Sequence, residues 1–164
     1  MINFILWLSI LLGVIAFICY NYYEKQQMLK RNISFLEGIN LTGLPIITFK
    51  CEDKVLAFVL DTGSNRCYID KEVIKYVPHT YKEQEDIILT SGAASQQSGI
   101  ATINLQHKGH IFDLDCCVLD MSEAFSGIKA SFGVTLHGLI GTDFFEKYKY
   151  VLDFDSMVAY SLKK

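Results

Sequence analysis

A single Asp-Thr-Gly turn at the end of an apolar run constrains this chain more than any other feature of its sequence. Residues 55–60 form a continuous apolar run that suits a buried strand, and Asp61-Thr62-Gly63-Ser64 follows at once. Gly63 allows a tight turn and lets its N–H approach the Asp61 carboxylate. The Ser64 hydroxyl is placed to donate to the same carboxylate, and the stiff, β-branched Thr62 carries a hydroxyl that can bond to another copy of the turn. Asp and Gly are also common in ordinary turns, so the motif needs support from elsewhere in the chain.

A second segment that supports this motif lies near the C-terminus. Residues 138–141 indicate a short apolar strand that ends in glycine, and Thr142 with Asp143 suits the start of a helix. Phe144, Phe145 and Tyr148 would give that helix an apolar stripe. Taken alone, the segment is equally compatible with an ordinary strand-to-helix junction.

A third segment, residues 87–103, contains two β-type runs on either side of small and polar residues. This pattern predicts a β-hairpin. Its tip contains Gly92, Ala93, Ala94 and Ser95. Without the other two segments, it would be a plain surface hairpin.

These three segments, in this order, resemble the retropepsin-like, single-lobe aspartic proteases, and they span most of residues 40–162. The resemblance implies that Asp61 is the catalytic residue and that the hairpin is a flap that closes over a peptide. It also implies an ion pair between Arg66 and Asp143, with a solvated Arg66 as the alternative. The implied supporting residues are Thr62, Gly63 and Ser64 in the turn, Gly92, Ala93, Ala94 and Ser95 in the flap, and Leu139, Ile140, Gly141 and Asp143 in the second signature.

The chemistry of this family needs two carboxylates that face each other and share one proton. Like charges about 3 Å apart cannot both ionise, so the ionised carboxylate activates a water and the protonated one donates to the peptide carbonyl. Because the chain has one such turn, the resemblance implies a homodimer that hydrolyses an extended segment of a protein substrate. The alternative is a catalytically silent module of the same fold, kept for dimerisation or peptide binding at a membrane. A silent module would have no need of the intact Asp61 turn.

Short apolar runs with turn signals predict a mainly β fold: a closed β-barrel lobe with one short C-terminal helix, preceded by an N-terminal transmembrane helix. The expected domains are an anchor (1–23), a juxtamembrane linker (24–38) and a protease domain (39–164). Within the last, we expect hairpins over 46–60 and 151–162, a helix over 71–76, a strand over 110–119 and a loop over 121–136.

The first 23 residues carry no charged side chain and are almost wholly apolar from Phe4 to Cys19. About 20 residues at 1.5 Å each can span the hydrocarbon core of a bilayer, which predicts a single-pass anchor. A cleaved signal peptide is the alternative, although no basic residue precedes the run and no small-x-small site follows it. Lys25, Lys30 and Arg31 favour a cytoplasmic domain by the positive-inside rule. Bacterial membrane-linked relatives of this fold favour the periplasm, so the side stays open.

Charge and spacing exclude several other functions. The net charge is −3 and no basic patch is present, so nucleic acid is not an expected partner. The five cysteines and four histidines have no metal-ligand spacing, and no metal or other cofactor is expected. The remaining partners are a second copy of the chain, a protein substrate and a membrane.

Overall fold

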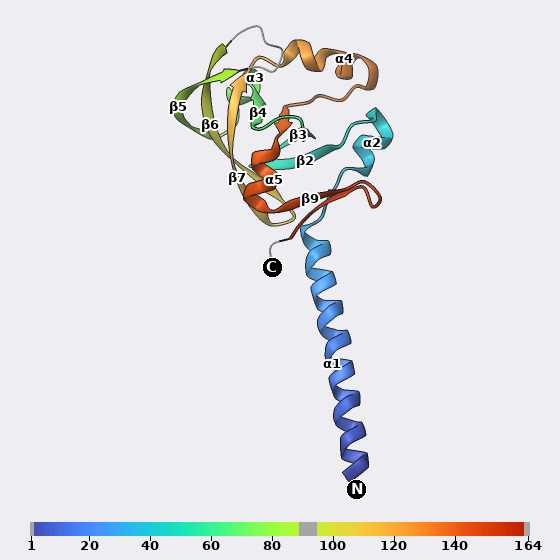
Figure 1. The fold of residues 1–164 in the computed structure, drawn as a ribbon. Coiled ribbons are helices and arrows are strands. Elements are labelled where there is room, and N and C mark those ends of the chain that lie inside the picture. The colour runs from blue at the N-terminus through green and yellow to red at the C-terminus, as the bar shows by residue number, and fades with distance from the viewer. Residues whose placement is uncertain (1, 89–94, 163–164) are drawn as a thin grey trace.

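The chain folds into a β-rich domain from which a long N-terminal helix extends (Figure 1). This computed structural model describes residues 2–88 and 95–162. The helices are α1 (Ile2–Arg31), α2 (Leu36–Thr42), α3 (Lys71–Ile74), α4 (Ser122–Phe132) and α5 (Thr142–Tyr148). The strands are β1 (Ile33–Ser34), β2 (Ile46–Cys51), β3 (Lys54–Leu60), β4 (Cys67–Asp70), β5 (His79–Ile88), β6 (Ser95–His107), β7 (His110–Leu119), β8 (Gly138–Ile140), β9 (Tyr150–Asp153) and β10 (Val158–Ser161).

Helix α1 is 30 residues long and leaves the domain below the β9–β10 hairpin (Figure 1). The side chains of residues 10–23 on this helix are exposed. In the described part of the chain, no helix combines the length and the apolar character that crossing a membrane requires. The span expected at residues 1–23 therefore has no support from the structure, and it stays a prediction together with the side of the membrane.

Six strands close into a barrel. One sheet has the order β2-β3-β8-β4-β7-β6-β5, and an additional pairing between β2 and β6, at Lys50 and Gln106, closes the first six of these strands, with β5 continuing beyond them. Inside the barrel, Phe49, Phe58 and Leu105 are at most 1% exposed. The expected mainly β fold with a closed barrel is confirmed, because alternating apolar side chains of opposite strands meet in one core.

Both short hairpins expected from the sequence are present. Strands β2 and β3 pair from Ile46 to Cys51, and β9 pairs with β10 in a separate sheet that also includes β1. Ile33 in β1 and the following Phe35 are 1% and 0% exposed. Part of the segment expected as a linker over 24–38 therefore contributes side chains to the core of the domain.

Strand β8 lies between β3 and β4, parallel to β3 and antiparallel to β4. The backbones come so close that a Cβ at Gly138 would overlap the carbonyl oxygen of Tyr68 and lie 2.7 Å from the Phe58 ring. Glycine is therefore required at this position. The insertion of β8 brings the expected second signature next to the end of β3, where Asp61 begins the turn.

The sequence predicts a loop over residues 121–136, but helix α4 occupies most of this segment. The prediction of a loop is therefore wrong. Phe125 and Ile128 lie one turn apart on α4 and pack against a buried cluster of Ile46, Val59 and Leu136. These contacts stabilise a helix whose Ser, Gly and Ala content gave only a weak helical pattern. Helix α4 thus covers the strands behind the Asp61 turn.

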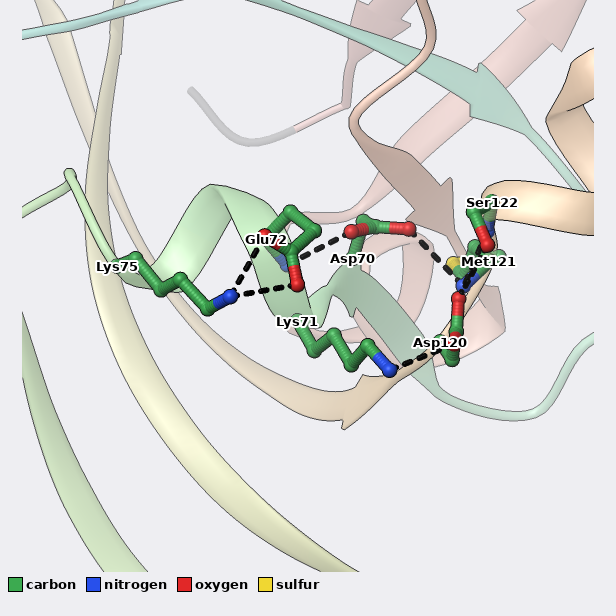
Figure 2. A network of polar contacts seen from close by, with 7 residues as sticks. All are labelled: Asp70, Lys71, Glu72, Lys75, Asp120, Met121 and Ser122. Atoms are coloured by element: carbon green, nitrogen blue, oxygen red, sulfur yellow. Dashed lines mark hydrogen bonds and ion pairs between the residues drawn. The ribbon is translucent and has the colours of Figure 1, made fainter.

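A buried carboxylate joins β4 to the start of α4. Asp70 is 7% exposed, and its oxygens accept hydrogen bonds from the N–H of Glu72 at 2.7 Å and of Met121 at 2.9 Å (Figure 2). The first bond caps α3, the short helix expected after the turn. Beside it, Lys71 and Asp120 form a partly exposed ion pair at 2.6 Å. Because its two oxygens hold the starts of α3 and α4, Asp70 has a structural role.

Candidate active site

The Asp61 carboxylate is held by donors of its own turn. Its Oδ1 accepts a hydrogen bond from the Gly63 N–H at 2.9 Å, and its Oδ2 accepts one from the Ser64 hydroxyl at 2.7 Å. Both bonds are those expected from the sequence. Asp61 is partly buried, whereas Thr62 and Gly63 are exposed. The turn therefore presents an oriented carboxylate near the surface.

The second signature lies against this turn, as the sequence predicts. The Asp61 N–H donates to the carbonyl of Ile140 at 2.9 Å, and the Thr142 N–H donates to the carbonyl of Ser64 at 2.9 Å. A Cβ at Gly141 would overlap the backbone of Arg66. Two chain segments separated by about 80 residues in sequence are thus joined by backbone bonds, which hold the turn more firmly than side-chain contacts alone would.

The members of the second signature differ in where they point. Ile140 is 0% exposed inside the barrel, whereas Leu139 packs on the outer face against the α4 side. Asp143 faces the end of the turn, where its two oxygens accept from the Cys67 N–H at 3.1 Å and from the Cys67 thiol at 3.0 Å. The expected pairing of Asp143 with Arg66 stays a prediction.

Cys67 is the site residue that sequence reasoning missed. In the sequence it is only one of five cysteines that have no metal-ligand spacing. Two features of the sequence were available as signals. Cys67 lies three residues after Ser64, and the second segment has an acidic residue, Asp143, at the start of its expected helix. Burial, Cys116 and Asp143 raise the pKa of the Cys67 thiol well above its ordinary range, so the thiol stays protonated and acts as a donor.

The hairpin expected as a flap has the predicted strands. Strands β5 and β6 pair in antiparallel fashion from His79 to Ile88, and Ser95 lies opposite Ile88 at the last described pair. The expected tip residues Gly92, Ala93 and Ala94 lie outside the described residues. Both strands extend beyond the hairpin expected over residues 87–103. Strand β5 begins at His79, and β6 continues to His107 while it pairs with β7.

A groove begins beside the Asp61 turn. Its volume is about 380 Å³, and it runs from the turn across α5 to β9. Its lining residues are Thr62, Thr142, Phe145, Glu146, Tyr150 and Leu152. Strand β9 is the last strand of its sheet among the described residues, so this groove lies beside a strand edge.

Two other observations concern metal ligands and the protonation of Tyr68. Among residues 2–88 and 95–162, no group of three His, Cys, Asp or Glu side chains is placed to hold a metal ion. Burial raises the pKa of Tyr68, with smaller contributions from Cys117, Asp143 and Asp61, and Arg66 acts in the opposite direction. Tyr68, on the strand after the turn, therefore stays neutral at ordinary pH.

A scan against protein-family models and a search of curated proteins find no match for this chain.

Proposed function

We propose that this chain is a retropepsin-like aspartic endopeptidase that acts as a homodimer. The observation that carries the proposal is the Asp61 carboxylate, held at a surface turn by the Gly63 N–H at 2.9 Å and the Ser64 hydroxyl at 2.7 Å. Asp61 is partly buried and the two residues that follow it are exposed, so this oriented carboxylate lies where a substrate or a second copy could reach it.

The proposed reaction uses Asp61 from each of two copies. The ionised Asp61 removes a proton from a water molecule, and the water oxygen attacks the peptide carbonyl carbon. The protonated Asp61 of the second copy donates its proton to the carbonyl oxygen, which gives a neutral tetrahedral intermediate. Its breakdown passes a proton to the leaving nitrogen and yields a carboxylic acid and an amine. The two carboxyls titrate as a pair throughout.

The exposed position of the turn supports a dimer. Thr62 is exposed and lies at the end of the groove that continues over Phe145 and Leu152, both only partly buried. A two-fold axis near Thr62 would bring two turns together and let each groove meet the same surface of the other copy. The substrate would then lie as an extended strand beneath the β5–β6 hairpin, where backbone hydrogen bonds give affinity.

Cleavage of an unstructured protein by the purified full-length chain tests the proposal. We expect fragments detectable by mass spectrometry with the wild type and with Asp53→Asn, which changes an exposed Asp in the β2–β3 turn. We expect none with Asp61→Asn. Equal cleavage by wild type and Asp61→Asn would refute the assignment of Asp61. Binding without cleavage by the wild type would favour the silent peptide-binding module instead.

A further inference from the structure

The catalytic turn is held by the second segment at its start, its middle and its end. At the start, the Asp61 N–H donates to Ile140, and in the middle the Ser64 carbonyl accepts from Thr142, both at 2.9 Å. At the end, the Cys67 N–H donates to Asp143 Oδ2 at 3.1 Å. The first two contacts involve backbone atoms alone, so any residue can make them. The third depends on the side chain of Asp143.

Cys67 supplies a second donor to the same carboxylate. Its thiol donates to Asp143 Oδ1 at 3.0 Å, and this oxygen also accepts from the Phe144 N–H at 2.7 Å. Three donors thus orient one carboxylate at the start of α5. Because Phe144 is 1% exposed inside the barrel, α5 cannot shift without disturbing the core.

The Cys67 thiol lies in a part of the core that is closed to solvent. Cys67 is 0% exposed, and its neighbour in the parallel pairing of β4 and β7 is Cys116, also 0% exposed. Removing the Sγ would leave Asp143 Oδ1 with one donor fewer in a partly buried place. The end of the turn would then be held by the Cys67 N–H alone.

We propose that Cys67 is a positioning residue for the Asp61 turn, acting through Asp143. Its thiol and N–H together fix the Asp143 carboxylate, which sets the end of the turn against α5 while Ile140 and Thr142 hold the rest. This inference rests on the proposed protease function for its effect on catalysis, but the hold on the turn can be measured without any activity.

The test compares Cys67→Ala with Cys116→Ala in the full-length chain. Both changes remove a fully buried thiol from neighbouring strands, but only Cys67 bonds Asp143. We expect hydrogen–deuterium exchange of peptides covering residues 61–67 to rise in Cys67→Ala and not in Cys116→Ala. We also expect kcat to fall roughly tenfold to a hundredfold in Cys67→Ala with KM nearly unchanged, because the carboxylate is misplaced and the substrate contacts are not. Cys67→Ser, which keeps a donor, should recover most of both effects.

Each result decides the proposal. Unchanged exchange in Cys67→Ala, or an equal rise in Cys116→Ala, would overturn the hold on the turn. Increased exchange with an unchanged kcat would overturn the effect on catalysis. If the wild type cleaves nothing, the proposed function fails, and the exchange comparison alone still decides whether Cys67 holds the turn. If Cys67→Ala does not fold, Cys67→Ser and Cys67→Thr replace it, and failure of both to keep wild-type exchange would contradict the role of the donor.

Discussion

Replacement of the buried carboxylate of Asp70 by alanine should destabilise the domain by about 2–4 kcal/mol. The side chain caps α3 through the Glu72 N–H, and loss of such a cap costs about 1 kcal/mol. It also satisfies the Met121 N–H, and a buried donor left without a partner costs about 1–3 kcal/mol. The two terms concern different donors, so we add them.

The assay is urea unfolding of the full-length chain, followed by near-ultraviolet circular dichroism, which reports the packing of the domain's aromatic side chains. Lys71→Ala is the matched control, since it breaks the neighbouring ion pair with Asp120 in the same network (Figure 2). This pair is about half exposed, so little change is expected. A free energy of unfolding for Asp70→Ala within about 0.5 kcal/mol of the wild type would refute the reasoning.

Three further predictions follow from the site and its surroundings. Ser64→Ala should lower kcat/KM about tenfold, because the hydroxyl bond at 2.7 Å orients the Asp61 carboxylate; an unchanged kcat/KM would contradict this role. Specific activity of the wild type should fall on dilution through the dimer dissociation constant, and a constant value down to a monomer seen by sedimentation would contradict the dimer. Burial lowers the pKa of His137 below its usual 6.5, and its Nδ1 accepts a hydrogen bond from the Ala57 N–H at 2.9 Å, which requires the neutral ring. The folded state then binds this proton less readily than the unfolded state. Above about pH 6.5 the free energy of unfolding is therefore not reduced by His137, and below that pH it falls as the pH decreases. In urea unfolding, the free energy of unfolding of His137→Gln should decrease less than that of the wild type as the pH is lowered. An equal decrease would contradict the assignment.

Local patterns were sufficient for much of the fold. Alternating and continuous apolar runs bounded by turn residues predicted the β2–β3 and β9–β10 hairpins, strand β7 and the strands of the β5–β6 hairpin. Each of these strands either pairs with a strand that is close to it in the sequence or is long enough to show a clear apolar pattern. The Asp61 turn was equally accessible, since its two hydrogen bonds come from residues within three positions of it.

Helix α4 could not be predicted because its stability comes from distant residues. Its apolar side chains Phe125 and Ile128 are separated by small residues, which gives a weak helical pattern. They become a packing face only because the fold places Ile46, Val59 and Leu136 against them. In the same way, the partnership of Cys67 with Asp143 joins residues 76 positions apart, and no local pattern distinguishes it from an Arg66 pairing.

A subunit-mixing experiment tests most directly the claim that two copies of Asp61 make one site. Wild type and Asp61→Asn are mixed in equal amounts, allowed to exchange well above the dimer dissociation constant, and compared with wild type at the same total concentration. If both carboxylates are required, only wild-type pairs cleave, and activity falls to about one quarter. The Asp53→Asn variant, mixed in the same way, should leave activity unchanged. An activity of about one half in the Asp61→Asn mixture would show that each chain works alone, and would contradict the account.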